Sequence, residues 1–172
     1  MRSCDVFGIQ DLHVVEEDLG KRIDKEIAMG AQKWVSLHRH DSIGSCIKSL
    51  KEQGYQIIGT SPHERSSMLS DFDVTRKTAF LFGQEGEGLS EKAMEEADGC
   101  LKIPMFGFTE SLNISVSVAI VLHDVVTRLR KSEVAWGLSE SEKRALEMEW
   151  TMKSIKSVDA IIERYRQAEK NS

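Results

Sequence analysis

Apolar runs of four or five residues alternate with amphipathic stretches of helical length along most of the chain. Runs of that length are typical of strands, and the longer stretches are typical of helices that pack on a sheet. The runs are Leu12–Val15, Tyr55–Gly59, Thr78–Phe82 and Cys100–Ile103. Because strands and helices alternate, the pattern predicts an α/β fold with a mainly parallel sheet.

Capping and stop residues indicate where two of the helices begin and end. Asp41 or Ser42 can cap a helix that Gly54 stops, since a short polar side chain satisfies the first free backbone N–H groups and Gly favours the left-handed end. Residues 88–90 open a short acidic helix that ends near Ala97.

Residues 111–130 fit two structures at first sight, because apolar residues such as Leu112 and Ile114 alternate with polar ones as in a strand. The stretch contains neither Gly nor Pro and closes on Arg128 and Arg130. Cations are favoured at the C-terminus of a helix, so we predict a helix. At 1.5 Å per residue, residues 111–130 would make it about 30 Å long.

The pattern becomes purely helical beyond Gly137. Ser139 with Glu142 three residues later forms a capping box, and apolar residues recur at helical spacing as far as Tyr165. We therefore divide the chain into a domain of residues 1–131 and a helical extension of residues 132–172. The extension carries four basic residues that suit RNA or another subunit, although a solvated helix packed on its own domain explains them equally: Lys153, Lys156, Arg164 and Arg166.

The charge balance at first argues against a nucleic-acid partner, because 23 Lys and Arg face 28 Asp and Glu for a net charge of −5. The acidity is local. Residues 71–98 hold eight acids and three bases, whereas residues 127–172 hold ten bases and eight acids. The net charge therefore does not exclude a basic surface elsewhere on the protein. The longest apolar run, residues 118–122, is far shorter than a membrane span and no leader opens the chain, so we expect a soluble cytoplasmic protein without membrane association.

Cysteine and histidine spacing gives little sign of a metal centre. Cys4, Cys46 and Cys100 show no C-x-x-C spacing, so we interpret them as small buried apolar residues rather than a disulfide or zinc framework. His38 and His40 share one face of a strand and suit metal or RNA phosphate, but an isolated H-x-H is more often a surface feature. We predict no metal site, and the other three histidines have no partner pattern.

The densest glycine cluster, residues 82–90 (FGQEGEGLS), lies directly after an apolar run and before a helix. In α/β proteins ligands bind at this place, outside the carboxyl end of a strand. Neither G-x-G-x-x-G nor a Walker pattern is present. Glu85 and Glu87 would repel a pyrophosphate, so the loop favours a neutral or cationic ligand. An ordinary strand-to-helix turn explains the same glycines.

A second glycine-bearing loop, residues 103–110, follows another predicted strand and leads to Ser111 and Asn113 at the start of the long helix. Each of these two residues, taken singly, is explained as a helix cap. Their order and spacing relative to the first loop favour one cleft formed by both loops.

These segments resemble motifs of the SpoU/TrmH-type RNA ribose 2'-O-methyltransferases of the SPOUT superfamily. Residues 82–89 (FGQEGEGL) resemble the second motif, and IPM at 103–105 with SLNISVS at 111–117 resembles the third. RSCDVFG at 2–8 resembles the end of the first motif, and GAQKWV at 30–35 resembles a segment common in the tRNA branch. The likeness spans residues 1 to about 130, and the tail resembles that of tRNA guanosine 2'-O-methyltransferases acting in the D-loop.

The resemblance implies a parallel sheet with helices on both faces and a deep trefoil knot near the third motif, which sequence physics alone would not propose. It also implies a homodimer with RNA lying across both subunits, and the likeness to the tRNA branch implies that this RNA is tRNA. S-adenosyl-L-methionine would bind in the knot. The acidic loop suits this cofactor, because its sulfonium is cationic and it carries no phosphate.

The same resemblance implies the site residues. Arg2 would anchor the RNA phosphate and stabilise the 2'-oxygen, because a guanidinium stays protonated and is a poor base. Glu85 would orient the second loop, while Ser111 and Asn113 would shape the pocket. The four implied catalytic residues are Arg2, Glu85, Ser111 and Asn113. The implied cofactor-binding residues are Thr60, Gly83, Ile103, Met105, Ser111 and Leu112.

One departure from the family concerns the first motif. Family members begin with a strand and an Asn-containing loop ahead of the motif-one Arg, whereas Met1 directly precedes Arg2 here. We therefore expect the first strand to be missing from the sheet, which would leave backbone groups unpaired. Three alternatives stay open: the same reaction on ribosomal RNA or the tRNA wobble ribose, a non-catalytic RNA-binding or scaffolding dimer, and a nucleotide-binding α/β protein, which the acidic loop disfavours.

Overall fold

The structure, a computed structural model, describes residues 1–15, 30–62, 66–84, 86–109 and 111–170. These residues form two compact units, Met1–Ala135 and Trp136–Ser172, and each is described by itself. None of the described helices is both long and apolar enough to cross a membrane.

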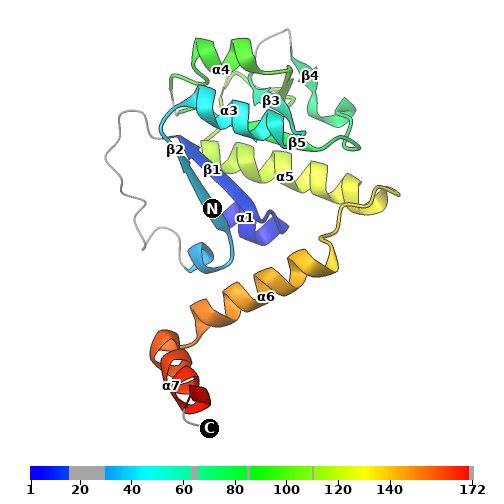
Figure 1. The fold of residues 1–172 in the computed structure, drawn as a ribbon. Coiled ribbons are helices and arrows are strands. Elements are labelled where there is room, and N and C mark those ends of the chain that lie inside the picture. The colour runs from blue at the N-terminus through cyan, green and yellow to red at the C-terminus, as the bar shows by residue number, and fades with distance from the viewer. Residues whose placement is uncertain (16–29, 63–65, 85, 110, 171–172) are drawn as a thin grey trace. The chain divides into compact units, whose positions relative to one another are not determined.

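All strand pairs described in the first unit are parallel (Figure 1). Four strands form a sheet of order β4-β6-β3-β5, and β1 pairs with β2 in a separate two-stranded sheet. The predicted parallel pairing is thus confirmed, although the described strands divide into two sheets rather than one. The strands are β1 Asp11–Val15, β2 Ser36–His40, β3 Gln56–Thr60, β4 Ser67–Met68, β5 Thr78–Leu81 and β6 Gly99–Lys102.

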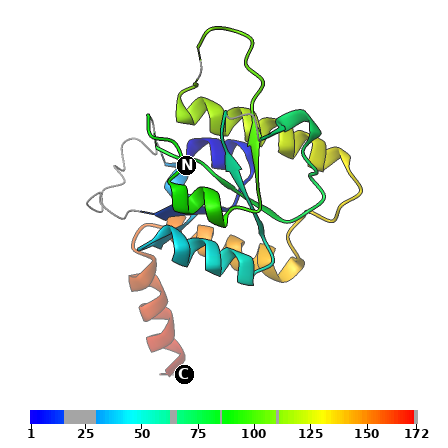
Figure 2. The same cartoon turned by 90° about the horizontal axis from the view of Figure 1, so that it is seen from above.

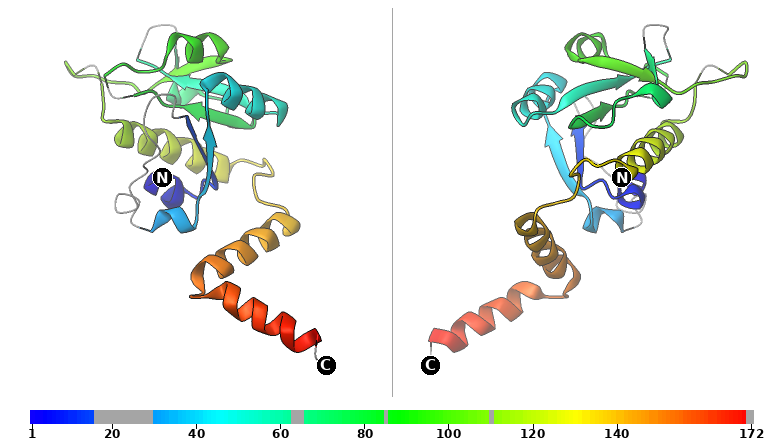
Figure 3. Two further views of the ribbon diagram at one scale, coloured as in Figure 1. Left: turned by 60° about the vertical axis from the view of Figure 1, so that its left-hand side comes forward. Right: turned by 90° about the vertical axis from the view of Figure 1, so that its right-hand side faces the viewer.

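Helices cover both faces of the four-stranded sheet, as expected from the resemblance (Figures 1 and 2). The helical elements of the first unit are α1 Arg2–Phe7, η1 Ala31–Lys33, α3 Ile43–Glu52, η2 Leu69–Asp71, α4 Glu91–Glu96 and α5 Ile114–Lys131. Successive strand residues point to opposite faces. Accordingly Ile57 packs with Ile47 of α3, whereas Ile58 packs with Val121 of α5. The two views of Figure 3 show the sheet between these layers.

The predicted helix starts are confirmed by their caps. The Ser42 hydroxyl accepts the Ser45 N–H at 3.2 Å at the start of α3, and the Ser90 hydroxyl accepts the Ala93 N–H at 3.3 Å at the start of α4. The stretch with two interpretations is the helix α5, and Asn113 caps it. Local side chains therefore determine where these helices begin.

The sequence did not identify α1 or β4 as elements, whereas the strand expected to carry His38 and His40 is present as β2. Helix α1 is six residues long and buries only Cys4, which packs with Val35 and with Leu122 of α5. The Phe7 ring also meets the His123 ring edge-on at 5.9 Å between centroids. Tertiary packing on α5, not a local apolar pattern, stabilises this short helix.

The second unit consists of α6 Glu140–Ser154 and α7 Val158–Lys170. The predicted capping box is present at its start, because the Ser139 hydroxyl accepts the Glu142 N–H and the Glu142 carboxylate accepts the Ser139 N–H at 2.7 Å. The two helices are separated by residues 155–157, of which Ser157 adopts a left-handed backbone with φ of 60°. The predicted helical tail is thus two helices.

Candidate functional site

Three of the implied cofactor residues lie at one edge of the four-stranded sheet. Thr60 ends β3, while Gly83 and Ile103 follow the ends of β5 and β6. Strand β3 lies between the other two and is parallel to both, so the three carboxyl ends point the same way. This edge of a parallel sheet is where α/β proteins place ligands.

The Thr60 hydroxyl is engaged in holding this edge together. It donates to the Leu81 carbonyl at 2.9 Å, which ties the end of β3 to the end of β5. The next residue, Ser61, is buried and donates its backbone N–H to the Leu101 carbonyl at 3.0 Å. These two bonds set the spacing between the loops that follow the three strands.

The glycine loop after β5 is closed by its own backbone. Gln84 and Gly88 exchange two N–H···O bonds, each of 3.0 Å, and Gly86 and Gly88 have φ values of 93° and 74°. Residues other than Gly rarely adopt that left-handed backbone conformation. A Cβ at Gly83 would lie 1.9 Å from the Gly88 carbonyl carbon, so only Gly allows the two backbone segments to meet.

The loop is also anchored to the sheet beneath it. The Leu89 side chain reaches Gly59 of β3, where an added Cβ would lie 3.0 Å from it and 3.1 Å from the Cys100 sulfur. Burial raises the pKa of the Cys100 thiol, so it stays protonated here. Glu87 is exposed on the loop, and Glu85, implied as a catalytic residue, lies outside the described residues.

The second loop, which follows β6, presents apolar side chains to solvent. Met105 is 36% exposed, and Phe106 and Phe108 are almost fully exposed. Ser111 and Leu112 are exposed at the end of this loop, next to the start of α5. The sequence correctly placed these residues on a loop after a strand, but their exposure is not evident from the sequence.

Asn113 has a clear local role, because its side-chain oxygen accepts the Ser115 N–H at 2.9 Å and caps α5. The capping interpretation of Asn113 is therefore correct. Arg2 begins α1 and is exposed. Since α1 packs on α5 through Cys4 and Leu122, the two segments that carry Arg2 and Asn113 belong to neighbouring helices (Figure 1).

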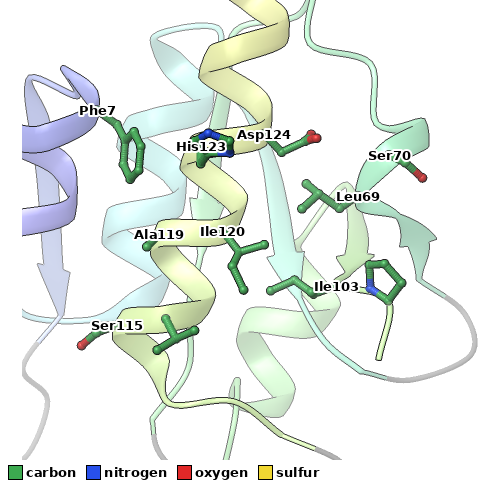
Figure 4. A pocket seen from close by; sticks show the side chains of 11 residues that line it. Phe7, Leu69, Ser70, Ile103, Ser115, Ala119, Ile120, His123 and Asp124 are labelled. Carbon is green, nitrogen blue, oxygen red and sulfur yellow. The ribbon is translucent and has the colours of Figure 1, made fainter. Parts of the chain in front are cut away.

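An open apolar groove of about 690 Å³ runs along α5 and begins at Ile103 and Pro104, the first residues of the second loop (Figure 4). Leu69 of η2 and Phe7 of α1 contribute to its walls. The remaining lining residues are Ser70, Ser115, Val116, Ala119, Ile120, His123 and Asp124. The groove is not evident from the sequence, where its one local signal is the spacing of three and four residues from Val116 to His123.

The two loops fit a cationic ligand better than a phosphate. Neither residues 82–90 nor residues 103–110 contain Lys or Arg, and the exposed Glu87 carboxylate lies on the first loop. S-adenosylmethionine suits loops that lack Lys and Arg and carry a carboxylate, because it has a cationic sulfonium and no phosphate. The apolar side chains of Ile103, Met105 and Leu112 are suited to the uncharged remainder of such a molecule.

The model of the SpoU rRNA Methylase family matches residues 1–123 of the chain. A tRNA (guanosine(18)-2'-O)-methyltransferase of Borreliella burgdorferi is 35% identical over 161 residues, which cover 94% of this chain and 74% of that protein. A protein of the same name from Thermus thermophilus is 38% identical over 124 residues, which cover 72% of this chain and 64% of that protein.

Two solved structures have the same fold. The A. aeolicus TrmH/SpoU tRNA modifying enzyme superposes with a TM-score of 0.77 at 30% identity, over 90% of this chain and 81% of that one. The SpoU methyltransferase AviRb from Streptomyces viridochromogenes, solved in complex with the cofactor AdoMet, superposes with a TM-score of 0.69 at 25% identity, over 76% of this chain and 54% of that one.

The fold and the two loops define an α/β protein with its ligand site at the carboxyl ends of adjacent parallel strands. Within that class, the chain belongs to the SpoU rRNA methylase family, as the motif resemblance predicted.

Proposed function

We propose that this chain transfers a methyl group from S-adenosylmethionine to a ribose 2'-hydroxyl of RNA, at guanosine 18 in the D-loop of tRNA. The observation that carries the proposal is the self-closed, cation-free glycine loop beside the second loop at adjacent strand ends, in a member of the SpoU family. The choice of tRNA is supported by the names of the Borreliella and Thermus relatives. We also propose that the enzyme works in the cytoplasm, one place where tRNA is found.

The bound cofactor would supply a methyl group on a cationic sulfur. The chain's own contribution is mainly to hold that group in line with the ribose oxygen. Gly83 keeps the first loop against the strand end, and Thr60 sets the distance to the next strand. Ile103, Met105, Ser111 and Leu112 would form the wall of the second loop.

Arg2 would bind the RNA phosphate and stabilise negative charge on the 2'-oxygen, since its guanidinium is exposed and permanently charged. Asn113 would shape the cofactor pocket while its side-chain oxygen caps α5. The role proposed for Glu85 is to orient the second loop.

The enzyme would act as a homodimer. Val116 and Ile120 on α5 are 45% and 36% exposed, and both line the groove that starts at the second loop. Apolar side chains grouped on one helix face are typical of an interface. The exposed basic residues of the helical extension would then meet the RNA backbone: Lys153, Lys156, Arg164 and Arg166.

The trefoil knot is also proposed for this chain. Strand β6 lies between β3 and β4, both of which precede it in the sequence. Helix α5 carries Arg128 to the carbonyls of Leu69 and Phe72, in the segment between β3 and β5. Such contacts are expected where the chain after β6 passes through the loop between β3 and β5.

The proposal is tested by transfer of tritiated methyl groups from S-adenosylmethionine to tRNA. We expect transfer by the wild type, and losses of at least about 100-fold in Arg2→Ala, because removing one transition-state donor costs that much. Asn113→Asp retains an oxygen for the cap but loses the amide donors, so a loss there reports on the reaction rather than on helix α5. Lys48→Ala, an exposed change on α3, is the control.

Equal transfer by wild type, Arg2→Ala and Asn113→Asp would contradict the proposed site. Cofactor binding without transfer to tRNA would favour the alternative of a non-catalytic RNA-binding dimer. Transfer to ribosomal RNA in place of tRNA would contradict the proposed substrate but not the reaction.

A further inference from the structure

Three side chains with metal-binding atoms meet outside the proposed methyl-transfer site. They are His13 of β1, His40 of β2 and Cys46 of α3, and their ligand atoms all lie within 4.8 Å of one another. The His13 Nδ1 and the His40 Nε2 are 2.9 Å apart. Both histidines are half-buried and Cys46 is buried, with 2% of its surface exposed.

The strand register explains how the histidines meet. Strands β1 and β2 are parallel, with His13 opposite His38 and Val15 opposite His40. Because His38 and His40 are two residues apart, they lie on the same face as His13. The His13 ring accordingly stacks on the His40 ring, with 5.1 Å between centroids.

The third side chain is positioned by the helix that follows β2. Helix α3 begins at Ile43, three residues after His40, and the Ser42 cap holds its first turn. This turn places Cys46 in a cluster with Ile47 and Val15. All three side chains thus come from regular elements, which hold ligands more rigidly than loops do.

We propose that His13, His40 and Cys46 bind a zinc ion, with water at the fourth position. Two imidazole nitrogens and a thiolate are ligands that Zn²⁺ prefers, whereas Mg²⁺ and Ca²⁺ take oxygen ligands. Tetrahedral zinc holds such atoms roughly 3.3 to 3.6 Å apart. The two imidazole nitrogens, 2.9 Å apart, therefore have to separate by about 0.4 Å, and the separations from the thiol, at most 4.8 Å, have to close by up to about 1.2 Å.

His38 is not part of this set, although its ring stacks on His13 with 4.6 Å between centroids. Its Nε2 instead pairs with the Asp11 carboxylate at 2.8 Å. His38 is therefore a matched control, since it is an imidazole in the same stack that points at a different partner.

The ion would join β1, β2 and α3. Within the described part of the chain, the β1–β2 sheet shares no strand pairing with the four-stranded sheet. A metal bound only by the folded state stabilises that state by mass action. The site would thus fasten the two-stranded sheet to the helix that covers it.

The test is cobalt binding by the full, untagged chain after treatment with a chelator. We expect one Co²⁺ per chain, a thiolate-to-cobalt charge-transfer band, and displacement of Co²⁺ by Zn²⁺. Cys46→Ser should abolish the band, and His13→Asn or His40→Asn should weaken binding by more than about 100-fold, since even outer contacts of a metal site are worth 10- to 100-fold. His38→Asn and Cys100→Ser should bind as the wild type does.

Thermal unfolding does not depend on methyl transfer, and it also shows whether each variant is folded. Zinc should raise the Tm of the wild type and of His38→Asn, and leave the Tm of His13→Asn unchanged. Three results would each overturn the proposal: no stoichiometric binding, a band that persists in Cys46→Ser, or an equal loss of binding in His38→Asn. The cluster would then be a hydrogen-bonded histidine pair beside a buried thiol.

Discussion

Gly83 shows how one missing side chain shapes the proposed cofactor site. Its Cα faces the backbone of Gly88, and an added Cβ would lie 2.1 Å from the Gly88 oxygen. Because backbone cannot yield as a flexible side chain can, the loop would have to open. The glycine pattern predicted a ligand loop, but this contact between two backbone segments depends on the closed loop and is not visible in the pattern.

We predict that Gly83→Ala destabilises the fold by about 1 to 3 kcal/mol, as for other overpacked sites, and weakens binding of S-adenosylmethionine. Urea unfolding and titration calorimetry measure the two effects. Gly107→Ala is the control for stability, because a Cβ there meets nothing within 4 Å. Wild-type stability and binding in Gly83→Ala would contradict the packing described here.

Asp98 contributes a pH-dependent contact at the opposite end of β3. Its carboxylate accepts the Ile57 N–H at 2.8 Å and pairs with the Lys51 ammonium at 3.1 Å. The hydrogen bond from Ile57, with help from Lys51, lowers the pKa of Asp98 below its ordinary value of 3.8. The contact is therefore fully stabilising above the ordinary pKa and is lost as the pH falls through the lowered one.

We predict that Asp98→Asn lowers the free energy of unfolding by about 1 kcal/mol at neutral pH, since the side chain is partly exposed. The difference from wild type should shrink once the pH is below the ordinary carboxyl pKa. Urea unfolding at both pH values checks this, with the exposed Asp159→Asn of the second unit as control. A difference that persists at low pH would contradict the assignment.

At the scale of elements, α5 is fixed to the segment between β3 and β5 by one guanidinium. Arg128 donates from Nη1 to the Phe72 carbonyl at 2.6 Å and from Nη2 to the Leu69 carbonyl at 2.9 Å. The same side chain binds the Asp124 carboxylate through Nε at 2.8 Å. The sequence placed Arg128 at the helix C-terminus, where cations are favoured, but could not reveal these partners more than 50 residues away.

We predict that Arg128→Lys lowers the free energy of unfolding by about 2 kcal/mol, because a lysine cannot reproduce a planar fork with three acceptors. Lys131→Ala, an exposed change in the last turn of α5, is the control. Equal urea midpoints for wild type and Arg128→Lys would show that the hydrogen bonds from Arg128 to the Leu69 and Phe72 carbonyls do not stabilise the fold.

The elements that the sequence predicted well are those with local causes. The run Tyr55–Gly59 became β3 at Gln56–Thr60, and the capped stretch after Ser42 became α3, because apolar runs and caps act within a few residues. Helix α1 was missed because its stability comes from packing on α5. The His13–His40 pair was missed because its members are 27 residues apart in the sequence.

At the scale of the whole molecule, the fold class was predictable from alternation, and the family from the two loop motifs. The groove along α5 was not, because its walls come from four segments distant in the sequence. Which face of an amphipathic helix stays uncovered depends on what packs against it, and one chain's pattern does not contain that information.

We predict that Val116→Asp or Ile120→Asp converts a dimer to a monomer, since a buried carboxylate at an apolar interface is strongly unfavourable. Light scattering after gel filtration measures the mass. Met148→Asp, an equally apolar exposed residue of α6, is the control. A wild-type monomer, or dissociation by Met148→Asp alone, would contradict an interface along α5.

Methylation of a ribose 2'-hydroxyl of tRNA guanosine by this chain would be visible in the nucleoside product itself. An unmodified tRNA transcript is incubated with the chain and S-adenosylmethionine, digested, and analysed by mass spectrometry. We expect 2'-O-methylguanosine from the wild type and none from Arg2→Ala. A methyl group on the base, or no methylated nucleoside from a chain that binds the cofactor, would contradict the proposed reaction.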